Sequence, residues 1–111
     1  MDKIIGKVVD IQSDTENIWF SLKVTLSYGM SIPEQEVYFD CRIADYENYN
    51  KVLWALKSAK DIGTSVELGG YMMIDNPEEN EVQMWFSVFK MTFNGEVVYD
   101  IPAPKCQFVL S

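Results

Sequence analysis

Aromatic and cationic side chains alternate along two stretches of the chain, in a pattern suited to binding flat, negatively charged molecules. Trp19 and Lys23 stand on one side of the first alternating stretch, and Tyr38 and Arg42 stand on one side of the second. Aromatic rings stack on nucleobases, and lysine and arginine bind phosphate. Trp85, early in a later apolar stretch, joins them as the fifth residue of a candidate nucleic-acid-binding site. The alternative is that these aromatic residues fill a second small core or a subunit interface, where Trp and Tyr are also enriched.

Strands must position these residues, because apolar and polar residues alternate with a period of two. The alternation runs over 18–27 and again over 36–43, so one face of each predicted strand belongs to a core and the other to solvent. Asn94-Gly95 predicts a tight hairpin turn. Further strands are predicted over 3–12, 65–74, 82–93 and 96–101, with an acidic loop over 75–81.

One helix is predicted, because the period changes at Asp45. Apolar residues from Tyr49 to Ala59 follow helical spacing, which predicts a helix over 45–60. Asp45 is the expected N-cap, and Glu47 suits the positive helix start. Gly63 is expected to end the helix.

The order of these elements predicts a mainly β fold. Three strands, one helix, two strands and a hairpin extension follow one another, which is the plan of the OB-fold, a five-stranded antiparallel barrel with its helix between strands three and four. An α+β sheet with one helix on its face is the alternative. The length of 111 residues is expected to form one domain, 1–111.

The stretch 82–93 is apolar on both of its faces. Either the alternation changes phase at a bulge, or the strand is covered on both sides by another subunit. This stretch and the high aromatic content of 14% lead us to expect a homodimer or higher oligomer.

Composition excludes several function classes. The chain has 9 basic and 17 acidic residues, a net charge of −8, so it is not a general polycation for duplex DNA or acidic membranes. Histidine is absent, and the two cysteines, Cys41 and Cys106, have no metal or redox spacing. We therefore expect no enzyme activity, metal or cofactor, a buried Cys41 thiol, no membrane span and a cytoplasmic location.

Three short segments carry a family resemblance. The helix followed by 61–70 resembles the helix, turn and strand of bacterial single-stranded-DNA-binding proteins. The segments 37–43 and 93–99 resemble more closely an uncharacterised, replication-associated family that is carried on integrative conjugative elements and is similar to those proteins. The resemblance covers roughly residues 36–100 and implies an OB-fold and single-stranded DNA as the partner.

The chain departs from that pattern in two places. The usual basic turn is Asp61-Ile62-Gly63 here, and the acidic tail with which such proteins recruit partners is missing, since Asp100-Ile101-Pro102 is not terminal. Four carboxylates in the predicted loop 75–81 would also repel phosphate.

Two functions remain as hypotheses. The first is a single-stranded-DNA-binding accessory protein of replication or of a mobile element. The second is a protein-interaction barrel or homo-oligomeric assembly protein, which the net charge of −8 favours. If the first holds, acidic residues are expected to lie away from the candidate site, on the loops at 13–16 and 75–81.

Overall fold

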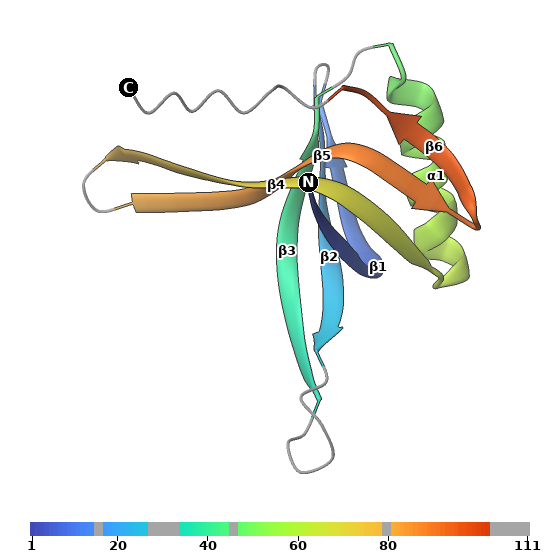
Figure 1. Ribbon diagram of the computed structural model, residues 1–111, viewed down its shortest axis with the longest axis horizontal. Coiled ribbons are helices and arrows are strands. Elements are labelled where there is room, and N and C mark those ends of the chain that lie inside the picture. The colour runs from blue at the N-terminus through green and yellow to red at the C-terminus, as the bar shows by residue number, and fades with distance from the viewer. Residues whose placement is uncertain (15–16, 27–33, 45–46, 79–80, 103–111) are drawn as a thin grey trace.

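In the computed structural model, the described residues form six strands and one helix (Figure 1). It describes residues 1–14, 17–26, 34–44, 47–78 and 81–102. The elements are β1 (Asp2–Ser13), β2 (Ile18–Leu26), β3 (Gln35–Ile43), α1 (Tyr49–Ile62), β4 (Ser65–Glu78), β5 (Glu81–Phe93) and β6 (Glu96–Asp100).

Five strands close into a barrel. β3, β2, β1, β4 and β5 pair in this order as antiparallel neighbours, and a short parallel contact between β3 and β5 joins the two ends. In that contact Cys41 is the partner of Phe86 and Arg42 that of Ser87. With α1 between β3 and β4, this is the predicted OB-fold, and the closed ring rules out the open sheet.

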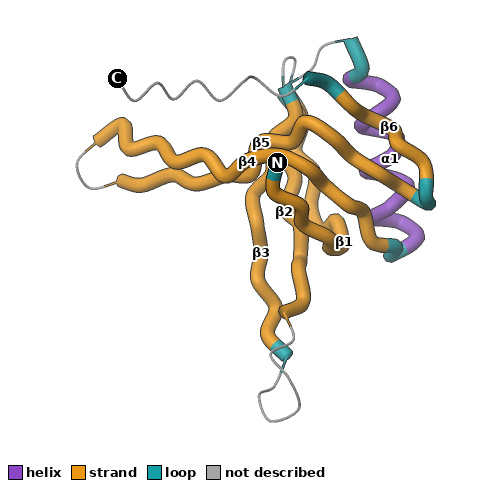
Figure 2. The backbone as a smooth tube through the Cα atoms, in the orientation of Figure 1, coloured by secondary structure: helices purple, strands orange, loops and turns teal. Residues whose placement is uncertain are grey.

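The barrel interior holds the core that the alternation predicted. Ile18, Phe20 and Leu22 point inward from β2, and α1 packs against β1 and β6 (Figure 2). Cys41 is fully buried, as expected, and its Sγ donates a long hydrogen bond of 3.6 Å to the Phe39 carbonyl. Burial, with a smaller contribution from the Asp40 charge, raises the pKa of the Cys41 thiol to about 12, so the thiol is inert at neutral pH.

A bulge resolves the ambiguity of the 82–93 stretch. Lys90 pairs with Gly69 and Val88 with Gly70, so Phe89 has no partner on β4. Phe86 and Val88 are buried before this point, whereas Met91 and Phe93 are buried after it. The phase of the alternation therefore changes by one residue at Phe89, and the two apolar faces of β5 need no second subunit to explain them.

The helix begins later than predicted. It runs from Tyr49 to Ile62 with Asn48 as the N-cap residue, and Glu47 precedes its first turn. Asp45, the predicted cap, lies outside the described residues. The first turn forms at Asn48, whose carbonyl accepts a 3.0 Å hydrogen bond from the Val52 N–H.

Both predicted stop and turn signals are confirmed. Gly63 ends α1 in the left-handed region, with φ 76°, and its N–H donates to the Ala59 carbonyl at 2.9 Å. Asn94 and Gly95 have φ angles of 54° and 79°, which is the backbone of a tight two-residue hairpin turn.

The predicted acidic loop is wrong for most of its length. β4 continues to Glu78 and β5 begins at Glu81, so these strands leave the barrel as a two-stranded ribbon (Figure 1). Asp75 pairs with Gln83 within this ribbon. Ladder hydrogen bonds between β4 and β5 override the weak strand preference of acidic residues here, because β-propensity depends on pairing context. No helix in the described part of the chain is long and apolar enough to cross a membrane.

The β4–β5 pairing leads to a prediction about two neighbouring glycines. A Cβ added to Gly70 would lie 1.9 Å from the Ser87 carbonyl oxygen, whereas one added to Gly69 would meet only ordinary van der Waals contacts at 3.4 Å and beyond. We expect Gly70→Ala to lower the free energy of unfolding by about 1–3 kcal/mol, because the strands must separate. Urea denaturation of both variants checks this, and an equal loss in Gly69→Ala would contradict it.

Candidate nucleic-acid interface

Barrel closure brings three of the five predicted site residues into one cluster. Trp19 and Arg42 are direct partners across β2 and β3. The Trp85 ring stands edge-on to the Trp19 ring, with 6.1 Å between centroids and 67° between planes. The Arg42 guanidinium carbon lies 5.7 Å from the Trp19 ring centroid, and its Nε donates to Asn17 Oδ1 at 3.0 Å. The cluster thus combines two indoles with an oriented cation.

The other two predicted residues lie farther along the same strands. Lys23 and Tyr38 are direct partners, separated from the Trp19–Arg42 pair by the Ser21–Asp40 pair. Tyr38 is 61% exposed, and Lys23 Nζ is 3.8 Å from Glu36 Oε1. All four residues therefore occupy the outward positions of β2 and β3, but they form two separate pairs.

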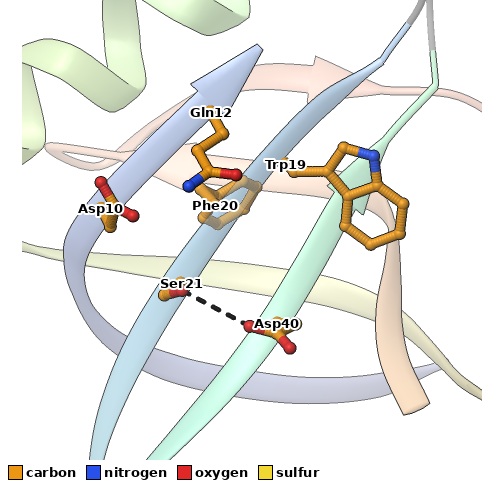
Figure 3. A pocket seen from close by; sticks show the side chains of 6 residues that line it. All are labelled: Asp10, Gln12, Trp19, Phe20, Ser21 and Asp40. Atoms are coloured by element: carbon orange, nitrogen blue, oxygen red, sulfur yellow. Dashed lines mark hydrogen bonds between the residues drawn. The ribbon is translucent and has the colours of Figure 1, made fainter. Parts of the chain in front are cut away.

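The aromatic cluster lines a groove that crosses four strands. Figure 3 shows the residues that line one hollow of about 260 Å³, and a second hollow of about 370 Å³ shares Trp19 and Asp40 with it. We call the two together the tryptophan groove. Its lining residues are Asp10, Gln12, Trp19, Phe20, Ser21 and Asp40 in the first hollow, and Trp19, Asp40, Gln83, Met84 and Trp85 in the second.

Acidic residues are not confined to the loops, contrary to expectation. Asp10 and Asp40 line the tryptophan groove, and Glu36 approaches Lys23. The reason is the alternation itself, since Glu36 and Asp40 occupy the same outward phase of β3 as Tyr38 and Arg42. The lining of the groove therefore combines two indoles with two carboxylates, and Arg42 lies beside Trp19 outside that lining.

Asp10 and Gln12 were missed as lining residues, because a bulge decides their direction. Lys7 and Val8 pair in register with Lys23 and Leu22, but Asp10 pairs with Ser21, which leaves Val9 without a partner on β2. After this bulge the even-numbered residues of β1 face outward. No residue type in β1 signals the bulge, so it could not be found from the sequence alone.

Gln83 and Met84 were also missed, because they lie on the ribbon rather than on the barrel wall.

Within the described residues, the buried Nε1–H of Trp85 has no hydrogen-bond acceptor. The same part of the chain contains no cluster of His, Cys, Asp and Glu that could hold a metal ion.

The barrel strands carry cations, although acidic residues outnumber them there as they do in the whole chain. Five of the nine basic residues lie there, and Lys7 and Lys23 stand directly opposite each other across β1 and β2. Like charges in this arrangement repel unless an anion lies between or beside them. Lys3 forms a 2.8 Å ion pair with Glu67, whose hydrogen bond and charge raise the pKa of Lys3. The five basic residues on the barrel strands are Lys3, Lys7, Lys23, Arg42 and Lys90.

Comparison with solved structures identifies the architecture. The chain is similar to the crystal structure of a small single-stranded DNA binding protein from Mycoplasma pneumoniae, with a TM-score of 0.58 and 7% sequence identity over 84% of this chain and 91% of that chain. The fold is the OB-fold. A second structure, a Plasmodium falciparum SSB complex with ssDNA, aligns with a TM-score of 0.49 and 10% identity over 84% of this chain and 86% of that one. No protein-family model and no curated protein matches the sequence. At these identities the OB-fold is what the likeness establishes.

The edge-on indole pair has a spectroscopic consequence. Two indoles 6.1 Å apart couple their electronic transitions, so we expect an exciton couplet in the far-ultraviolet circular dichroism spectrum. Trp85→Phe should remove the couplet. Trp54→Phe, which replaces an indole that is 65% exposed on α1, should leave it in place. A couplet that survives Trp85→Phe would contradict the packing of Trp19 on Trp85.

Proposed function

We propose that this protein binds single-stranded DNA through the tryptophan groove. The observation that carries the proposal is the contact of Trp19 with Trp85 and Arg42, with both indoles lining an open groove on the wall of an OB-fold barrel. Unpaired bases stack on aromatic rings without regard to sequence, and barrels of this fold use such platforms for single strands.

The charge distribution supports a single strand rather than a duplex as the partner. A net charge of −8 gives no long-range attraction for DNA, so affinity must come from short contacts. Arg42 and Lys23 supply cations on either side of the Ser21–Asp40 pair, and the two indoles supply stacking. Stacking needs unpaired bases, which a duplex does not offer.

The biological setting follows from the sequence resemblance. Residues 36–100 resemble the replication-associated family carried on integrative conjugative elements, and this supports an accessory role in replication or transfer of a mobile element. Such a role places the protein in the cytoplasm. The similarity in fold to a small single-stranded DNA binding protein supports the same activity.

Replacing Trp19 should separate stacking from charge. We expect Trp19→Ala to weaken binding of fluorescein-labelled oligo-dT by about 1–3 kcal/mol, with little change in the salt dependence. Lys23→Ala should instead lower the slope of log K against log salt by about 0.7 to 1. Fluorescence anisotropy across a salt series measures both quantities.

The matched control is Trp54→Ala, which removes an exposed indole from α1 outside the groove. It should bind oligo-dT like the unmutated protein. The proposal is overturned if the unmutated protein shows no oligo-dT binding at low salt, or if Trp19→Ala and Trp54→Ala bind equally well.

Association of the chain with itself is the second candidate function, and one observation favours it. The β4–β5 ribbon carries apolar side chains into solvent, with Ile74 67%, Met84 53% and Met73 43% exposed. Exposed apolar groups gathered on one projecting element are typical of protein-binding surfaces. We therefore propose that the ribbon mediates a homo-oligomer.

A charged residue on the ribbon should weaken that assembly. We expect sedimentation velocity at high micromolar concentration to show a dimer or larger species, and Ile74→Glu to shift it toward monomer. Ile62→Glu on α1 is the control, because Ile62 is equally exposed at 68% but lies off the ribbon. If the unmutated protein sediments only as a monomer, self-association is refuted.

A further inference from the structure

We propose that the tryptophan groove prefers guanine among the bases of a single strand, with Asp40 as the residue that reads it. This inference rests on the proposed function, since it assigns a base preference to the same groove. The observation behind it is the position of the Asp40 carboxylate, since a groove that bound only phosphate groups would not place a negative charge there.

Asp40 lies where the two hollows of the groove meet. It lines both of them together with Trp19, and it is exposed to solvent (Figure 3). Ser21 Oγ donates a 3.4 Å hydrogen bond to Asp40 Oδ1, which orients the carboxylate across β2 and β3. Among the described residues no Lys or Arg forms an ion pair with Asp40. The carboxylate therefore keeps most of its capacity to accept hydrogen bonds.

A phosphate cannot occupy the centre of the groove, because it would face this negative charge. Cations stand on both sides of Asp40 instead, with Arg42 two residues along β3 and Lys23 in the next cross-strand pair. A strand lying in the groove thus has cations for its backbone on either side and a hydrogen-bond acceptor between them. The group that meets Asp40 must be the edge of a base.

Trp19 places that edge within reach. Trp19 and Asp40 are diagonal neighbours across β2 and β3, since Trp19 pairs with Arg42 and Ser21 pairs with Asp40. Diagonal neighbours have Cβ atoms about 7–8 Å apart or slightly less, a span that a stacked base bridges. A base stacked on the Trp19 indole therefore directs an edge toward the carboxylate.

Only guanine presents two adjacent donors on its Watson–Crick edge, namely N1–H and the N2 amino group. The two oxygens of a carboxylate accept both in parallel, as they do from a guanidinium. Thymine offers one N–H between two carbonyl oxygens, and adenine and cytosine each place a ring-nitrogen acceptor beside their amino group. Each of these three would set an acceptor against a carboxylate oxygen, which costs affinity.

The test compares short oligo-dT with the same oligomer in which isolated thymidines are replaced by deoxyguanosine, in lithium buffer so that guanine quadruplexes do not form. By anisotropy we expect the dG-containing oligomer to bind about fivefold to tenfold more tightly, the range of one bidentate base contact reduced for solvent exposure. Deoxyinosine, which lacks the N2 amino group, should lose most of this gain.

Asp40→Asn should abolish the preference, because the paired acceptors for guanine are lost, and it should raise the affinity for oligo-dT, because the repulsion of phosphate is removed. Glu96→Gln is the control for charge, since it removes a carboxylate from β6, outside the groove, and should leave the ratio unchanged. Equal binding of the two oligomers by the unmutated protein, or a ratio that survives Asp40→Asn, overturns the guanine preference while the proposed function stands. Failure of both oligomers to bind overturns both.

Discussion

The parallel contact between β3 and β5 is the constraint on which the rest of this structure depends. Only Cys41 with Phe86 and Arg42 with Ser87 form it, yet it turns a five-strand sheet into a closed barrel. The inward members of the two pairs, Cys41 and Phe86, are fully buried, so the contact is fixed by core packing as well as by backbone hydrogen bonds. The outward members of the two pairs, Arg42 and Ser87, matter for the candidate site. Because Ser87 lies beside Arg42, Trp85, two residues earlier in β5, reaches Trp19.

Two bulges then decide what the barrel shows to solvent. The bulge at Val9 turns Asp10 and Gln12 into the tryptophan groove, and the bulge at Phe89 allows β5 to bury Phe86 in one phase and Met91 in the other. Near the second bulge, Gly70 lets β4 approach the Ser87 carbonyl more closely than any side chain would permit. Beyond this point the two strands leave the barrel as the ribbon seen in Figure 1.

Net charge is a poor guide to what such a surface binds. The chain carries −8, yet five of its nine cations lie on the barrel strands, two of them opposite each other as Lys7 and Lys23. Asp40 interrupts this set at the centre of the groove. Aromatic rings, cations and a central carboxylate thus lie close together on one face of an acidic protein.

Patterns within single strands were enough to predict the architecture. The period-two alternation of β2 and β3 identified which face is buried, the change of period identified a helix between β3 and β4, and Asn94-Gly95 identified the final turn. The same alternation placed Trp19, Lys23, Tyr38 and Arg42 on the outward face, because the direction of a side chain in a regular strand depends only on its position in the sequence.

Pairing between distant strands determined everything else. The strand character of 75–78 and the outward direction of Asp10 both depend on pairing with segments that no local pattern specifies. The meeting of Trp19 with Trp85, 66 residues later in the chain, required the barrel to close. A sequence pattern records the direction of a side chain, but the neighbour that it meets is decided by register and closure, which are properties of the whole barrel.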